Sequence, residues 1–356
     1  MLITRSGRNL GPLVIVDKFL ARFALSDDMI RISVSSNDDL FYVAAILNTK
    51  TGQSLIRRDR NGSVIDHPGP GQIASLQIPL LPDNLRNAAV TAFKLAHELR
   101  EQARLTLDVL ASQFLQSVNL LNWESRMKSE DQVRRFAVLR NSISDRIDSE
   151  PNSPCYSAFR AMINKCGYGR AIGEISQVMK PTGRYTTLYV DDEEFGVKLL
   201  SGRQIAQFRA IGLKIMSRSA WKNPEEYILK KGMVLLTSDG RAKENLADCA
   251  MVRSDRNGWT ASGHVHRLTT NDGIHPGLLY LACSCMLVQR ILKCLATGSV
   301  IDALSEPDVK SVPVPYPTST SATRMGEEAV EAWDQFAKAS ELESSAVAKL
   351  EGEILA

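Results

Sequence analysis

The stretch "NGSVIDHPGPGQIASLQIPLLP" (Asn61–Pro82) has a second version in the same chain, "TGSVIDALSEPDVKSVPVPYP" (Thr297–Pro317). Both contain Gly-Ser-Val-Ile-Asp, and both continue into alternating apolar residues that end in prolines. The offset between the two words is 298 − 62 = 236 residues, and it persists at Ile73/Val309, Leu76/Val312, Ile78/Val314 and Pro79/Pro315. An internal repeat sets the architecture of a whole chain, so the extent of this repeat decides the fold.

The repeat extends in both directions. Upstream, the offset of 236 holds at Phe23/Trp259, Arg31/Arg267 and Gln53/Gln289. Small slips change it to 279 − 41 = 238 at "FYVA" against "LYLA", and to 234 − 1 = 233 at "MLITRSGR" against "VLLTSDGR". Downstream, Ala89 falls on Ala329, an offset of 240, and the match continues to Leu115/Leu355. Chance similarity of short apolar words would not persist over such a length, so the sequence predicts a duplicated unit.

Composition excludes several classes of protein. The chain has 356 residues, 44% of them hydrophobic and 23% charged, which is enough for two ordinary globular domains. The six cysteines show no CxxC spacing, so neither a zinc ribbon nor a disulfide framework is predicted, and reduced thiols indicate a cytoplasmic protein. We expect no secretory signal, and the longest uncharged apolar run, Gly277–Val288, is too short to cross a membrane.

Two segments predict long helices that pack on each other. Residues 83–117 contain no proline or glycine, and small apolar residues recur along them at the spacing of a coiled-coil seam. The repeat places a similar seam near the C-terminus, and small residues on both would let two antiparallel helices approach closely. The alternative is that each helix lies on its own domain. The predicted interface residues are Ala92, Ala96, Leu99, Ala103, Leu110, Ala332, Phe336, Ala339 and Leu350.

The segments before the helices predict α+β modules. "MLITRSG" and "MVLLTSDG" are typical of short strands that end in glycine turns, and "MIRISVS" and "HVHRLTT" alternate like strands. "IASLQIPLLP" and "VKSVPVPYP" also alternate, and their prolines suit an edge strand. The copies are unequal, because Trp123–Gly232 has no counterpart before the first. We expect that either the gene begins within a module or another polypeptide supplies the missing half.

This layout and several of its words resemble the specificity subunit of type I restriction–modification systems. "YILKKGMVLLTSDGR" is similar to a segment of that family's target recognition domain, and "VKLLSGRQIAQF" resembles its central strand and turn. "LYLACSCMLVQRILKCLATGSVIDALSEPDVKSVPVPYP" is similar to its closing helix, Gly-Ser turn and proline strand. The resemblance covers most of the chain. It implies an α+β fold in which target recognition domains are separated by long antiparallel coiled-coil-like spacer helices, with the first module truncated at its N-terminus.

The resemblance also implies the domain plan and the partners. Residues 1–82 would be the C-terminal half of a first target recognition domain, 83–122 a spacer helix, 123–318 a second, complete target recognition domain, and 319–356 the C-terminal spacer helix. The protein would bind double-stranded DNA and direct DNA methyltransferase subunits to a bipartite site. A restriction or translocase subunit would be a further partner. It would be non-catalytic, without a cofactor and without a membrane partner.

In a DNA reader, lysine and arginine hold phosphates, and arginine, glutamine or asparagine on loops read base edges. Between Arg170 and Lys243 there are thirteen Lys/Arg against eight Asp/Glu, and several of them follow turns. The competing interpretation is that each of these side chains only keeps the surface of the protein soluble and has no part in DNA binding. The candidate DNA contacts are Lys180, Arg184, Tyr185, Arg203, Gln204, Lys214, Arg218, Lys222, Arg241 and Lys243, with Arg5 and Arg8 in the first copy.

Other functions are weaker predictions. Pro154-Cys155 lacks the cofactor loop of a methyltransferase, and "DDEEF" is better explained as a solvated turn than as a nuclease site. His264 and His266 alternate on a predicted strand, and a metal needs three or four convergent ligands, so no metal site is expected. The main alternative is a non-catalytic protein-interaction scaffold of a defence complex, with degenerate DNA recognition.

Overall fold

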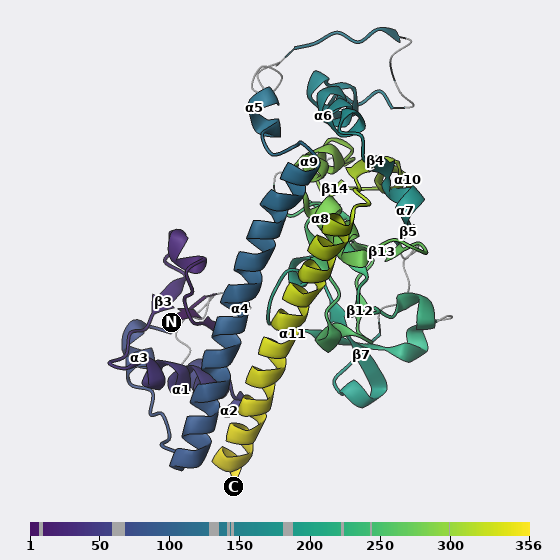
Figure 1. Cartoon of the computed structure of the whole chain (residues 1–356). Helices are drawn as coiled ribbons and strands as arrows, with labels where there is room; N and C mark the ends of the chain where they lie inside the picture. The colour runs from purple at the N-terminus through teal and green to yellow at the C-terminus, as the bar shows by residue number, and fades with distance from the viewer. Residues whose placement is uncertain are drawn as a thin grey trace. The chain divides into compact units, whose positions relative to one another are not determined.

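The computed structural model describes residues 1–6, 10–58, 68–127, 135–140, 143, 146–180, 188–221, 224–242, 244–298 and 300–356. These residues form two compact units. The first comprises Met1–Leu105 and Asp334–Ala356, and the second comprises Thr106–Trp333. Two long helices, α4 (Asp83–Ser117) and α11 (Thr320–Leu355), each contribute to both units (Figure 1).

The first unit has a small antiparallel sheet of order β2-β1-β3, with β1 at Leu2–Thr4, β2 at Leu13–Val14 and β3 at Met29–Arg31. Three helices follow: α1 (Asn37–Leu47), α2 (Lys50–Arg58) and α3 (Pro70–Ala74). Helix α1 begins where the Ser36 side chain accepts a hydrogen bond from the Asp39 amide, an ordinary N-cap. One apolar core joins the sheet, α1 and the beginning of α4.

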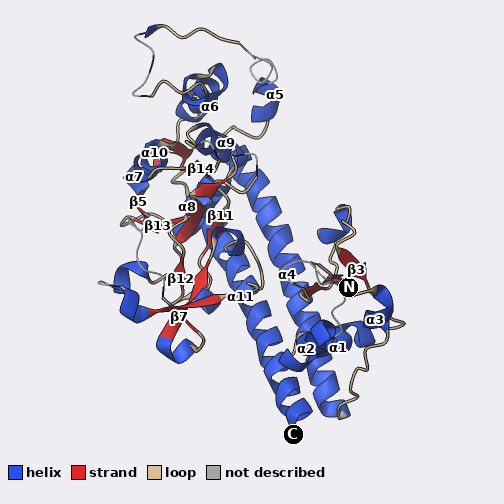
Figure 2. Cartoon of the chain, turned by 180° about the vertical axis from the view of Figure 1, so that it is seen from behind, coloured by secondary structure: helices blue, strands red, loops and turns tan. Residues whose placement is uncertain are grey.

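The second unit contains the longer set of strands, which Figure 2 shows in red. One four-stranded sheet has the order β11-β9-β13-β5 and another the order β12-β7-β8-β6, while two-stranded pairs join β10 to β14 and β15 to β4. The strands are β4 (Gly169–Ala171), β5 (Ser176–Met179), β6 (Tyr189–Val190), β7 (Gly196–Leu200), β8 (Lys214–Ser217), β9 (Val234–Thr237), β10 (Asp239–Gly240), β11 (Cys249–Met251), β12 (Thr260–Ala261), β13 (Val265–Thr270), β14 (Asp302–Ala303) and β15 (Pro313–Pro315). The helices that lie wholly within it are α5 (Trp123–Met127), α6 (Pro154–Lys165), α7 (Ile172–Ile175), α8 (Pro276–Ser284), α9 (Met286–Cys294) and α10 (Glu306–Ser311).

The strand registers confirm the duplication. In the first unit Leu2 pairs with Arg31, and in the second Leu235 pairs with Arg267, which are the positions that offsets of 233 and 236 predict. On the other side, Ile3 pairs with Leu13 as Leu236 pairs with Cys249. Because a slip of one residue would turn every side chain to the opposite face, identical registers show that β2-β1-β3 and β11-β9-β13 are the same arrangement.

The equivalence extends to the helices and to one side-chain hydrogen bond. Adding 236 to the bounds of α2 gives those of α9, Met286–Cys294. The amide of Gln53 donates to the Gly11 carbonyl (3.0 Å), and its counterpart Gln289 donates to Ala247 (3.2 Å). Gly11 and Ala247 are themselves 236 residues apart and both have a positive φ, +100° and +65°. A strained φ kept by a non-glycine residue indicates that this turn is an integral part of the repeated unit.

The first copy lacks the final strand that its sequence predicts. In the second copy β15 is a strand because it pairs with β4. The first copy has no equivalent of β4 among the described residues, and its residues 77–79 therefore form no strand, while the preceding Ile73 lies in α3. The repeated word Gly62–Asp66 lies outside the described residues.

The prediction that the long helices pack antiparallel is confirmed within the first unit, where the C-terminal half of α11 runs beside the N-terminal half of α4 (Figure 1). Phe93 shares a core with Ala346 and Leu350, and further along α4 Arg100 pairs with Glu343. Since the residue numbers rise on one helix as they fall on the other, the helices are antiparallel. Of the predicted interface residues, Ala96, Ala103, Leu110, Ala332, Phe336, Ala339 and Leu350 are buried, and Ala92 and Leu99 are half-buried.

Within the second unit, α11 also packs closely on α8. A Cβ added to Gly277 of α8 would lie only 1.9 Å from the Gly326 carbonyl oxygen of α11, so two glycines allow the backbones to meet. Next to this contact the rings of Tyr280 and Trp333 pack edge to face, with centroids 5.4 Å apart. The C-terminal part of α11 therefore packs within the first unit, and its N-terminal part packs within the second unit.

We predict that Arg100→Ala lowers the free energy of unfolding by about 1.5–3 kcal/mol, because it leaves the largely buried Glu343 carboxylate without its two charged hydrogen bonds. Urea denaturation of both proteins measures the difference. Lys94→Ala is the matched control, since its partner Asp38 is solvent-exposed and surface ion pairs contribute about 0–1 kcal/mol. Equal losses for the two variants would contradict the prediction.

No single helix among the described residues is long and apolar enough to cross a membrane. Only α8 and α9 taken together pass that test, and they are bent by 66° relative to each other.

Candidate nucleic-acid interface

Arg203 lies on a loop that is tightly hydrogen-bonded to itself. The loop follows β7 as a short 3-10 helix, Gly202–Gln204, and continues to β8. The side chain of Gln204 accepts a hydrogen bond from the Ser201 amide (2.8 Å) and donates to the Ile211 carbonyl (2.6 Å). Gln204 therefore holds the loop together, whereas the neighbouring Arg203 is exposed and makes no hydrogen bond or ion pair with any described residue.

Two buried arginines support this loop from beneath. Arg256, only 2% exposed, donates to the Ile205 carbonyl at 2.7 Å and to the Gln207 carbonyl. Arg253 donates to the Phe208 carbonyl at 2.9 Å while its guanidinium is paired with Asp255. Burial, reinforced by the charge of Arg253, lowers the pKa of Arg256 to about 9, so this guanidinium is still a cation at neutral pH. The hydrogen bonds from these two buried guanidinium groups to carbonyls of the loop make the loop rigid.

A second cationic group is gathered around Asp239. Its carboxylate accepts a hydrogen bond from Lys180 at 2.8 Å and another from Ser238, and His264 Nδ1 lies 3.4 Å away. Burial alone would raise the pKa of the Asp239 carboxyl, but the hydrogen bonds from Lys180 and Ser238 and the Lys180 charge outweigh it and lower that pKa. Lys180 is thus held in one place at the end of β5 by a carboxylate that stays ionised.

The fold brings these two groups together. A Cβ added to Gly202 would lie 3.4 Å from Thr237 Cγ2 and 3.9 Å from the His264 carbonyl oxygen, so the Arg203 loop adjoins the Asp239 group. Arg241 follows β10 closely, and Lys214 begins β8 directly opposite Leu199 at the end of β7. We call Lys180, Arg203, Lys214 and Arg241 the basic end of the second unit. Four cations from separate chain segments are thus carried on or next to the Arg203 loop and the Asp239 group, an arrangement suited to contacts with phosphates.

The remaining predicted contacts are distributed differently. Arg218 is exposed just past Ser217, and Ser217 pairs with Gly196, at the end of β8 opposite to Lys214. Lys214 lies over the ring of Tyr189 at 4.3 Å, and Arg241 pairs with Glu244 at 3.1 Å. Arg5 is half-buried in the first unit, so it is not part of the basic end. Arg8, Arg184, Tyr185, Lys222 and Lys243 lie outside the described residues.

Sequence reasoning missed Arg253 and Arg256. The segment "VRSDRNG" reads as a polar turn, and nothing in it shows that both guanidinium groups are buried. Their contacts join residues 45 to 51 positions apart, which local pattern does not reveal. The nearby His266 is likewise buried and bonds the Leu304 carbonyl at 3.1 Å. Among the residues that the structure describes, no group of three or more His, Cys, Asp or Glu is placed to hold a metal ion.

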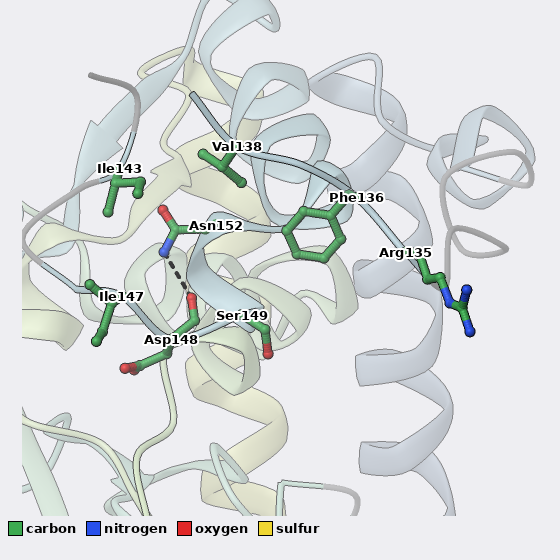
Figure 3. Close-up of a pocket in the computed structure, with 8 residues that line it drawn as sticks. All are labelled: Arg135, Phe136, Val138, Ile143, Ile147, Asp148, Ser149 and Asn152. Carbon is green, nitrogen blue, oxygen red and sulfur yellow. Dashed lines mark hydrogen bonds between the residues drawn. The ribbon is translucent and has the colours of Figure 1, made fainter. Parts of the chain in front are cut away.

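A separate pocket of about 390 Å³ lies in the second unit and is shown in Figure 3. It is lined by Arg135, Phe136, Val138, Ile143, Ile147, Asp148, Ser149 and Asn152, in which the Asn152 amide donates to the Asp148 carbonyl. All these residues come from one segment, and none belongs to the basic end. We therefore do not assign it to the candidate interface.

No family model matches the sequence, and no curated protein is similar to it. Solved structures that resemble the chain include type I restriction–modification specificity subunits. The S subunit from M. genitalium is 14% identical, with a TM-score of 0.39, and the match covers 99% of this chain and 81% of that one.

Two further solved structures are similar. The HsdS subunit from Thermoanaerobacter tengcongensis is 13% identical with a TM-score of 0.34, covering 88% of this chain and 68% of that one. A chain from a structure described as showing complex assembly and conformational transition of the type I system is 14% identical with a TM-score of 0.34, covering 98% and 79%.

Proposed function

We propose that the protein is a non-catalytic specificity subunit that binds double-stranded DNA in a sequence-specific way and directs DNA methyltransferase subunits to a bipartite site. In this proposal residues 123–318 are the complete recognition domain and residues 1–82 are half of another. The basic end is the observation that carries the DNA-binding part, because Lys180 is held by the partly buried Asp239 carboxylate and the loop that carries Arg203 is bonded to the buried Arg253 and Arg256.

The duplicated unit supports the proposal of a bipartite site. Two copies of one strand-and-helix arrangement, each followed by a long helix, suit a protein that reads two related half-sites. Helix α4 has 35 residues, and at about 1.5 Å per residue it is about 50 Å long. That length exceeds one turn of B-DNA, about 34–36 Å, so the helix is long enough to act as a spacer.

Sequence preference is the test of the proposal. The purified chain with its methyltransferase partner is mixed with a library of random duplexes, and bound duplexes are sequenced at several salt concentrations. We expect an enriched asymmetric sequence and an affinity that falls steeply with salt, because lysine and arginine contacts to phosphates release counterions. No enrichment at any ionic strength would exclude a specificity subunit.

We predict that Arg203→Ala relaxes discrimination at one base pair by about 1–3 kcal/mol, because an exposed arginine on a rigid loop can make a bidentate contact with guanine. Arg203→Lys keeps the charge and should lose the same discrimination. Lys214→Ala is the matched control, and should weaken all sequences about equally with a salt slope shallower by about 1. Binding selections on the three variants measure both quantities. If Arg203→Ala weakens binding to all DNA sequences equally, the Arg203 side chain contacts a phosphate and not a base.

A protein-interaction scaffold is the second candidate. It is favoured by the apolar side chains that the first unit exposes, among them Val16, Phe23 and Leu25. Co-purification of methyltransferase subunits without DNA binding would support this candidate over the first.

A further inference from the structure

The second copy of the repeated word, residues 298–302, presents two apolar side chains to solvent. Val300 is 86% exposed and its neighbour Ile301 is 62% exposed. Single exposed apolar residues are ordinary on a protein surface, whereas two adjacent ones on a loop indicate a contact with another molecule. The first copy has Val64 and Ile65 at the equivalent positions, although the three residues that follow the word differ completely between the copies.

The loop that carries this pair is closed by backbone contacts. Thr297 and Ala303 exchange two backbone hydrogen bonds, 2.9 and 2.7 Å long. Gly298 has a φ of +143°, and a Cβ there would lie 2.0 Å from the Ile301 carbonyl oxygen, so only glycine fits this turn. The loop therefore holds both side chains in place. Because valine and isoleucine are branched at Cβ, they also have little rotamer freedom to lose on binding.

The base of this loop adjoins the basic end. Strand β10 begins at Asp239, whose carboxylate holds a lysine of the basic end. Its second residue, Gly240, pairs with Asp302 of β14 in an antiparallel register. The next position in that register places Ile301 opposite Arg241, which is itself part of the basic end. The apolar tip is thus continuous with the cations that are proposed to hold phosphates.

We propose that Val300 and Ile301 contact the 5-methyl group of a thymine in the major groove, so that the recognised DNA sequence contains a thymine at this place. The inference rests on the proposed function. Neither side chain has a hydrogen-bonding atom, and the apolar group that a base edge offers in the major groove is the thymine methyl. Wedges that separate base pairs are generally larger side chains such as phenylalanine, leucine or methionine, and Val300 is smaller than these.

The test compares thymine with deoxyuridine in the duplex that the chain enriches, because deoxyuridine pairs with adenine and lacks only the 5-methyl group. Each thymine is replaced in turn, and the affinity of the full chain with its methyltransferase partner is measured by fluorescence anisotropy. We expect one or two replacements to weaken binding about fourfold, the effect of one methyl group left out of an apolar contact. The double variant Val300→Ala, Ile301→Ala should bind the thymine and deoxyuridine duplexes equally at those positions.

Leu188→Ala is the matched control, because Leu188 is 51% exposed in the same unit and its carbonyl bonds the Ser217 amide, at the end of β8 opposite to Lys214. This variant should respond to deoxyuridine as the unchanged chain does.

The proposal is overturned if no replacement distinguishes the unchanged chain from the double variant. Silent replacements together with weaker DNA binding by the double variant would show that the tip is a wedge between base pairs. Loss of the methyltransferase partner with unchanged DNA binding would show that the tip is a protein contact, and either result overturns the proposal. If no duplex is enriched at all, the proposed function has failed, and this inference fails with it.

Discussion

Replacing Arg256 with alanine is expected to lower the free energy of unfolding by about 3–5 kcal/mol, the cost of breaking a buried charged network. The guanidinium donates to the carbonyls of Ile205 and Gln207, and these acceptors would be left in a buried position without a donor. The same change should disorder the Arg203 loop. Urea denaturation measures the first effect, and amide exchange of residues 201–211 measures the second.

Arg203→Ala is the matched control for Arg256→Ala. It removes a guanidinium from the same loop, but an exposed one, so the free energy of unfolding should change by at most about 0.5 kcal/mol. Arg256→Lys is a second variant that keeps the charge but lacks the planar fork that reaches two carbonyls. If Arg256→Ala is as stable as Arg203→Ala, the buried arginine does not support the loop.

Acid should destabilise the second unit through His266. Burial lowers the pKa of His266 from 6.5 to about 4; the nearby charge of Lys180 adds to this, and the hydrogen bond to Leu304 and the charges of Asp239 and Glu306 oppose it without outweighing it. The unfolded chain therefore binds more protons than the folded one between these two values. The stabilisation is fully present above pH 6.5 and is lost as the pH falls to about 4, a change of about 3 kcal/mol.

The pH dependence is measured by urea denaturation between pH 4 and 7. His266→Gln, whose amide does not titrate, should remove most of the slope in this window. The control is His264→Gln, because His264 is 70% exposed and lies on the same segment. A slope that His266→Gln leaves unchanged would assign the acid sensitivity to other groups.

The sequence alone predicted much of the architecture. Offsets of 233 and 236 anticipated that Leu2 and Arg31 would pair as Leu235 and Arg267 do, and the small residues along residues 83–117 anticipated an antiparallel helix pair. Local sequence indicates both features, because the spacing of apolar side chains and the turn residues are repeated wherever the sequence is repeated. Arg203 could also be singled out from its glycine turn.

Tertiary structure alone decided how each of these local patterns is used. Two closely related proline-containing stretches have different fates, since residues 313–315 become a strand only where β4 is present to accept and donate hydrogen bonds. Similarly, Gln204 and Arg203 are equivalent candidates by sequence, but in the structure the Gln204 side chain is hydrogen-bonded within the loop and the Arg203 side chain is exposed. Sequence periodicity fixes which backbone segments can form strands and helices, whereas burial and hydrogen-bond partners come from residues distant in the chain, and these determine which cations remain exposed.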